Sequence, residues 1–120
     1  MKLKLFITFL FLGVLKISAQ EILWVDSLHY DFGEIQQGIG VEHIFYFKNH
    51  HFKVVAIETV RTDCGCTETV WSESSIEPDQ VGQINVKYDA FKRGYFRKKI
   101  KVFFKNIKKS HTLVIEGFVN

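Results

Sequence analysis

The sequence predicts an all-β protein, an antiparallel β-sandwich of about seven strands that follows an N-terminal signal segment. Three observations support this prediction. Runs in which apolar and polar residues alternate recur along the chain, as is typical of strands with one buried face. Short turn signals separate these runs. Of the 120 residues, 47% are hydrophobic and 12 are phenylalanine, which is enough apolar surface for the core of one domain.

Each predicted strand is a short alternating run bounded by turn residues. The runs occupy residues 29–32, 41–48, 54–60, 83–89, 96–105 and 111–119. The turn signals between them lie at Gly33, Gly38 and Gly40, at residues 49–51, at Pro78 and Asp79, at Arg93 and Gly94, and at residues 106–110. Six or seven short strands at this spacing predict two packed sheets.

Two of the runs indicate which side chains form the core. In residues 41–48 we expect Phe45 and Phe47 to point inward, together with Val41 and His43. The inward face of residues 96–105 is predicted to hold Phe96, Lys98, Ile100, Val102 and Phe104. Its outward face is predicted to hold Arg97, Lys99, Lys101, Phe103 and Lys105. This alternation predicts a sheet with one face in water.

The first nineteen residues have the pattern of a secretory signal peptide. Lys2 and Lys4 precede an apolar run at residues 5–15, and Ala19 supplies the small residue that signal peptidase requires. We therefore expect cleavage after Ala19, a mature domain of residues 20–120, and a periplasmic or secreted location without a stable membrane span. A retained anchor is the less favoured alternative, because the run would extend only about 16 Å as a helix, against about 30 Å of hydrocarbon.

The two parts of the mature chain carry opposite charge. Residues 20–86 hold eleven acidic and three basic residues, whereas residues 87–120 hold ten basic and two acidic ones. The predicted outward row of Arg97, Lys99, Lys101, Phe103 and Lys105 is therefore a candidate interaction face for an anionic envelope component or an acidic protein. Two alternatives are that the halves pair with each other and that the row is a solvated face that protects a sheet edge. Export argues against nucleic acid as the partner.

A series of short motifs runs in a characteristic order through residues 28–119. It comprises Tyr30-Asp31-Phe32-Gly33, Val41-Glu42-His43, Cys64-Gly65-Cys66-Thr67, Pro78 before Gly82, Gly94 before Ile100, and Gly117 near the end. The order of these motifs resembles that of the bacterial family known as domain of unknown function 1573. The resemblance implies an immunoglobulin-like β-sandwich in an exported protein, similar to the modules of major sperm protein and cilium-associated groups. It implies no established enzymatic activity.

Cys64 and Cys66 are the two cysteines of the chain. Residues i and i+2 of a regular strand lie about 6.6 Å apart, and Gly65 allows the backbone to bend enough for a disulfide. Three hypotheses remain open for this pair. It is a structural disulfide or two structural thiols, a redox-active pair, or part of a site for copper(I) or zinc that takes a further ligand from a distant histidine or Asp63.

The sequence contains no signature of catalysis. No serine or cysteine nucleophile has an evident histidine partner, and no metal-finger spacing or glycine-rich phosphate loop occurs. We therefore predict no enzymatic activity and no cofactor. The predicted function is that of an exported interaction or structural module. The alternative is a periplasmic thiol-redox or soft-metal protein that uses Cys64 and Cys66.

Overall fold

The computed structural model describes residues 20–120, so the predicted signal segment lies outside the described residues. Within them the chain forms strands and loops, and no helix long and apolar enough to cross a membrane. The strands are β1 (Ile22–Trp24), β2 (His29–Ile35), β3 (Val41–Asn49), β4 (Ile57–Thr62), β5 (Thr67–Trp71), β6 (Val81–Tyr88), β7 (Gly94–Phe104) and β8 (His111–Val119).

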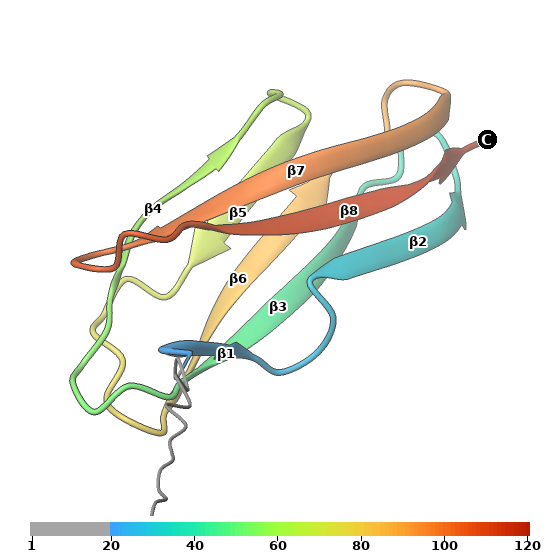
Figure 1. The fold of residues 1–120 in the computed structure, drawn as a ribbon. Coiled ribbons are helices and arrows are strands. Elements are labelled where there is room, and N and C mark those ends of the chain that lie inside the picture. The colour runs from blue at the N-terminus through green and yellow to red at the C-terminus, as the bar shows by residue number, and fades with distance from the viewer. Residues whose placement is uncertain (1–19) are drawn as a thin grey trace, which may run out of the picture.

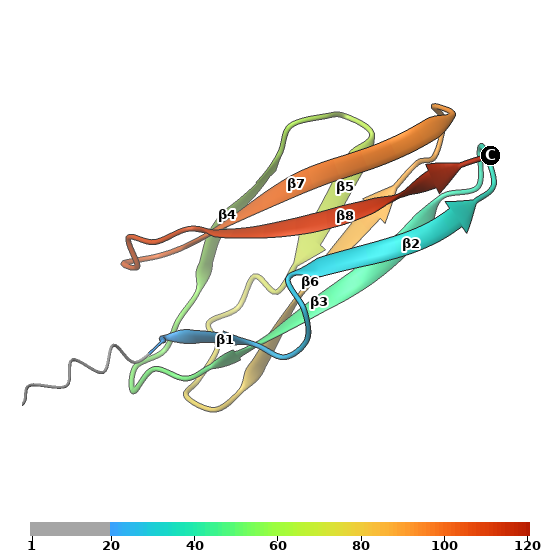
Figure 2. The ribbon, with the colours of Figure 1, turned by 45° about the vertical axis from the view of Figure 1, so that its right-hand side comes forward.

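The eight strands form two four-stranded sheets that face each other. The first sheet has the order β1-β3-β6-β5 and the second has the order β2-β8-β7-β4. Figure 1 shows the two layers, and Figure 2 shows that β1 and the C-terminus lie at opposite ends of the sandwich. The predicted all-β sandwich is confirmed.

Three details of the predicted strands are corrected. The structure has eight strands rather than about seven, because β1 and β5 were not predicted. The run predicted at residues 54–60 becomes a strand only at Ile57, and Val55 instead forms an isolated bridge with Ile76. The sheets are also not wholly antiparallel, since β2 pairs with β8 in the parallel direction. No hairpin joins these two strands, so no turn imposes the antiparallel direction on them.

The core lies between the sheets and is built from the predicted inward faces. Phe45, Phe47, Ile84 and Val86 of the first sheet are buried, as are Phe96, Ile100, Val102 and Phe104 of the second. The rings of Phe47 and Phe104 meet edge to face with centroids 5.2 Å apart and so join the two layers. The predictions for residues 41–48 and 96–105 are confirmed in this respect.

Gly82 makes room for the largest of these side chains. It is the cross-strand partner of Phe47, and a Cβ atom at this position would collide with the Phe47 ring. The glycine therefore has a packing role, because the ring lies directly over its Cα.

A second link between the sheets joins Trp24 of β1 to His111 of β8. The indole Nε1–H of Trp24 donates a hydrogen bond to Nδ1 of His111 at 3.0 Å. An acceptor at Nδ1 requires the neutral imidazole with its proton on Nε2. Burial lowers the pKa of His111 below its ordinary value, an effect that Lys109 reinforces and Glu21 opposes.

This lowered pKa predicts a loss of stability in acid. The unfolded chain takes up a proton at His111 near pH 6.5, whereas the folded chain does so only at lower pH. The free energy of unfolding should therefore have its full value above about pH 6.5. It should fall as the pH drops from there through the folded pKa of His111. Urea titrations across this range should show a shallower decline for His111→Phe, with part of the slope retained because burial also lowers the pKa of His43. An unchanged slope would contradict the role of His111.

Candidate functional site

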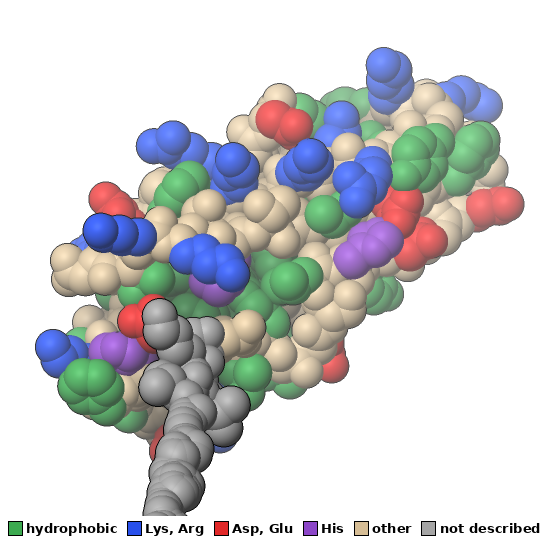
Figure 3. Space-filling view, in the orientation of Figure 1, with side chains coloured by type: hydrophobic (Ala, Val, Ile, Leu, Met, Phe, Trp, Pro, Cys, Tyr) green, Lys and Arg blue, Asp and Glu red, His purple; other side chains and the backbone are tan. Residues whose placement is uncertain are grey.

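The outward face of β7 carries the row of basic residues that the sequence predicted. Arg97, Lys99 and Lys101 are exposed, Phe103 is half-buried, and Lys105 follows the last residue of the strand. Successive outward positions on a strand lie about 6.6 Å apart, so these charges form a line along the sheet. Figure 3 shows basic side chains along this face of the second sheet.

Arg61 of β4 extends this row to the neighbouring strand. It is the cross-strand partner of Lys101, and its guanidinium lies 5.1 Å from the centre of the Phe103 ring. This cation–π contact presents the ring and the charge on one surface. We call Arg61, Arg97, Lys99, Lys101, Phe103 and Lys105 the basic face. The sequence did not indicate Arg61, because the predicted strand ended at residue 60.

No residue of the basic face is neutralised by a direct ion pair within residues 20–120. The ion pairs in this part of the chain are His29 with Glu116, Lys48 with Asp79, and His51 with Glu21. None of the ten lysines and arginines of residues 87–120 takes part in them. The two halves do meet across the first sheet, where Lys87 lies opposite Glu42 and Glu68, but this pairing does not include the cations of the basic face.

Negative charge on the same sheet lies toward β8 and β2. Glu116 is the cross-strand partner of Arg97 and accepts a hydrogen bond of 2.6 Å from the Tyr95 hydroxyl. This bond, with a smaller contribution from His29, lowers the pKa of Glu116. The carboxylate is therefore engaged at the β2 side of the sheet, and the opposite side, around Lys99, Lys101 and Arg61, is cationic.

The second candidate site is the loop between β4 and β5, where the chain passes from one sheet to the other. Cys64 and Cys66 are half-buried there and form a disulfide, with their Cα atoms 5.3 Å apart. The backbone amide of Cys66 donates to Sγ of Cys64 at 3.1 Å, and Oγ1 of Thr67 lies 3.7 Å from Sγ of Cys66. An amide directed at Cys64 would stabilise a thiolate on that sulfur after reduction.

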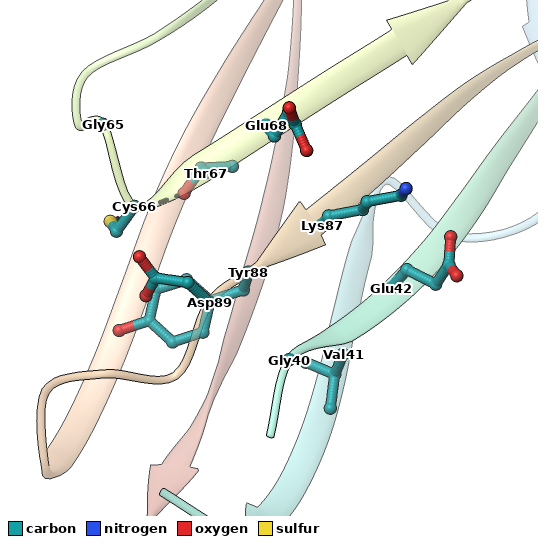
Figure 4. Close-up of a pocket in the computed structure, with 10 residues that line it drawn as sticks. All are labelled: Gly40, Val41, Glu42, Gly65, Cys66, Thr67, Glu68, Lys87, Tyr88 and Asp89. Carbon is teal, nitrogen blue, oxygen red and sulfur yellow. Dashed lines mark hydrogen bonds between the residues drawn. The ribbon is translucent and has the colours of Figure 1, made fainter. Parts of the chain in front are cut away.

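A cleft of about 570 Å³ is lined by Cys66 of this disulfide, and Figure 4 shows its lining residues. Its lining consists of Gly40, Val41, Glu42, Gly65, Cys66, Thr67, Glu68, Lys87, Tyr88 and Asp89. Lys87 is the cross-strand partner of both Glu42 and Glu68, so opposite charges alternate across the three strands. Burial raises the pKa of Tyr88 and keeps its phenol neutral. This lining contains no nucleophile with an adjacent base.

The proposed metal ligands lack further donors nearby. Within residues 20–120 no three histidine, cysteine or acidic side chains lie together in a way that could hold a metal ion. Metal binding at Cys64 and Cys66 would require reduction of the disulfide and a ligand from elsewhere.

Comparison with protein families gives a match over almost all of the described chain. The model of the family described as protein of unknown function (DUF1573) matches residues 23–119. The chain belongs to this family. The suspected resemblance is thereby confirmed, and the motifs from Tyr30 to Gly117 all lie within the matched range. No curated protein matches this DUF1573 chain.

Solved structures similar to this DUF1573 domain support an immunoglobulin-like fold. A PapD-like domain of human CEP192 has a TM-score of 0.72 and 10% identity, with 90% of this chain and 93% of that domain covered. A protein of unknown function from Porphyromonas gingivalis has a TM-score of 0.69 and 14% identity, with 85% of this chain covered. This chain spans about half, 49%, of that protein's length. At these identities the likeness shows the fold alone.

A member of the major sperm protein family extends the comparison. The Caenorhabditis elegans protein WR4 has a TM-score of 0.53 and 6% identity, with 85% of this chain and all of WR4 covered. An immunoglobulin-like sandwich of this kind serves many unrelated functions, so the function has to be argued from surfaces and sites.

Proposed function

We propose that this DUF1573 protein is an exported, non-enzymatic binding module whose basic face docks on an anionic component of the cell envelope. The observation that carries the proposal is the line of cations on β7 and Arg61 of β4, none of which forms an ion pair within residues 20–120. Export is expected from the signal pattern of residues 1–19.

A row of like charges without ion pairs destabilises the isolated protein and attracts a partner of opposite charge. Like charges along one strand repel each other, so the row opposes folding slightly. A negatively charged partner would remove this repulsion and would be attracted from a distance before contact. Phe103, held under the Arg61 guanidinium, supplies an apolar anchor among the charges.

Reversal of two central charges tests the basic face. In K99E/K101E the protein should be captured by immobilised envelope fragments at least tenfold less well, and the remaining capture should depend less on salt. The matched control is K108E/K109E, which makes the same change of net charge in the exposed turn between β7 and β8. Equal losses in both variants would show that only net charge matters and would contradict a specific face.

The structure supports a second candidate, a protein that exchanges thiols and disulfides. The supporting observation is the Cys66 amide that donates to Sγ of Cys64, beside an open cleft. A thiolate of an envelope protein would attack one sulfur, form a mixed disulfide and release the other cysteine as a thiolate. Equilibration in glutathione buffers, followed by alkylation and mass spectrometry, measures the reduction potential. A potential below about −300 mV would indicate a static disulfide and exclude this candidate.

A separate measurement tests binding of soft metals. If the reduced protein retains copper(I) or zinc in native mass spectrometry and Cys64→Ser loses it, the pair is a metal site. Absence of retained metal would leave the disulfide as a structural or redox element.

A further inference from the structure

One end of the sandwich exposes an unusual set of side chains. The turn between β2 and β3 and the turn between β6 and β7 meet at this end, which also holds the C-terminus (Figures 1 and 2). Phe91 is 70% exposed, Tyr95 63% and Ile39 57%. Lys92 and Arg93 lie between the two aromatic residues in the sequence and are exposed as well. We call these five residues the aromatic tip.

The two turns of the aromatic tip are held together by hydrogen bonds. The amide of Gly38 donates to the carbonyl of Ala90 at 2.9 Å. Nε2 of Gln37 donates to the carbonyl of Phe91 at 2.9 Å, and Nε of Arg93 donates to Oε1 of Gln37 at 2.8 Å. The tip is therefore a defined surface and not a pair of independent loops.

The residue before Phe91 has an uncommon backbone conformation. Ala90 is fully buried and has a φ of 59°, a left-handed conformation that residues other than glycine seldom adopt. The next residue, Phe91, is directed into water, with its amide donating to Oδ1 of Asp89 at 3.1 Å. The turn thus holds an exposed phenylalanine in a defined position, which makes it a candidate contact surface.

The charges of the tip identify the kind of surface it fits. Lys92 and Arg93 form no ion pair within residues 20–120. The nearby carboxylates of Asp89 and Glu116 accept hydrogen bonds from the Phe91 amide and the Tyr95 hydroxyl. Exposed aromatic rings flanked by cations suit the interface of an anionic bilayer, where the rings enter the headgroup region and the cations meet phosphates.

We propose that the aromatic tip inserts into the surface of a membrane that contains anionic lipid. A lipid surface is favoured because exposed aromatic rings and cations without ion pairs alternate along residues 91–95, the combination that suits an anionic headgroup region. The proposal stands apart from docking at the basic face, because it involves other residues at the end of the sandwich.

The opposite end of the sandwich offers a matched control. Phe52 is 79% exposed and precedes Lys53, so it repeats the order of Phe91 and Lys92. There His51 stacks on the Phe52 ring, with the ring centroids 4.5 Å apart, and pairs with Glu21. A tryptophan at position 52 therefore detects a membrane contact made through the end of the sandwich that holds Phe52, opposite the aromatic tip.

The experiment uses F91W and F52W in the exported protein with vesicles of phosphatidylglycerol and phosphatidylcholine that carry brominated acyl chains. The fluorescence of Trp24 and Trp71 is subtracted with the unsubstituted protein. We expect quenching and a blue shift for F91W and neither for F52W. Stronger quenching of F52W, equal quenching of both, or absence of quenching would overturn the proposal.

Charge removal gives a second readout. Each basic residue near an anionic surface contributes about a factor of five to partitioning, so K92Q/R93Q should bind these vesicles about 30-fold more weakly. K99Q/K101Q, which removes the same two charges from the basic face, should change vesicle binding less than K92Q/R93Q does. If a photoreactive residue at position 91 instead crosslinks to one envelope protein and vesicles do not bind, the tip is a protein contact and the lipid proposal is wrong.

Discussion

Replacement of Phe47 by alanine is expected to lower the free energy of unfolding by about 3 to 5 kcal/mol. The ring is fully buried and contacts Trp24 and Phe104, with centroids 5.6 and 5.2 Å away, so it joins three strands from both sheets. It also lies over Gly82, which has no side chain to fill the space that the ring would leave. The cavity cost should therefore add to the lost transfer free energy. Urea denaturation of the purified protein measures the effect.

The control for this prediction is another phenylalanine. Phe52→Ala removes a ring that is 79% exposed and should change the free energy of unfolding by less than about 0.5 kcal/mol. If Phe47→Ala cost less than about 1 kcal/mol, the two sheets would not be held together as described.

Replacement of Asn49 by alanine is expected to cost about 3 to 4 kcal/mol, although it removes a polar side chain. Asn49 is fully buried at the end of β3. Its Nδ2 donates to the carbonyls of Lys53 and Ile76 at 2.8 and 2.9 Å, and its Oδ1 accepts from the His51 amide at 2.8 Å. The substitution would leave the Lys53 carbonyl and the His51 amide without this partner, whereas the Ile76 carbonyl would still accept from the Val55 amide. Each buried unpaired group costs about 1 to 3 kcal/mol, and the loss of the hydrogen bond to Ile76 adds to this cost.

A second asparagine provides the comparison. Asn85 of β6 is half-buried, its Nδ2 donates to Glu42, and its Oδ1 has no partner in the described part of the chain. Asn85→Ala should therefore cost about 1 kcal/mol or less. Equal unfolding midpoints for the two variants would contradict the role assigned to Asn49.

Periodicity alone predicted the strands that bury a clear face. The inward positions of β3, β6 and β7 alternate strictly, because each of these strands has a neighbour on both sides and one face on the core. The same patterns located the basic row of β7. Both predictions depend on spacing within one strand, which the sequence contains in full.

The features that the sequence did not predict depend on which strands become neighbours. β1 has three residues and β5 is a polar edge strand of five, and both are too short or too irregular for a period-two pattern. The parallel pairing of β2 with β8 joins segments at the two ends of the domain. Arg61 joins the basic face only because β4 lies beside β7.

The surroundings of the disulfide loop also could not be predicted from the sequence. Spacing and Gly65 indicated that Cys64 and Cys66 could be bridged, whereas the cleft beside them is formed by β3, β5 and β6 together. No segment of the sequence contains that juxtaposition. The same holds for the aromatic tip, whose two turns are more than 50 residues apart and meet through the contacts of Gln37.

The central claim is that the basic face of the second sheet, and not the outer face of the first, meets the envelope partner. Photocrosslinking in intact cells tests it with p-benzoylphenylalanine placed at Phe103, and at Val70 of β5 as the comparison position. We expect crosslinks from position 103 that K99E/K101E abolishes, and few or none from position 70. Crosslinks from position 70 alone, or crosslinks from position 103 that persist in K99E/K101E, would contradict the account.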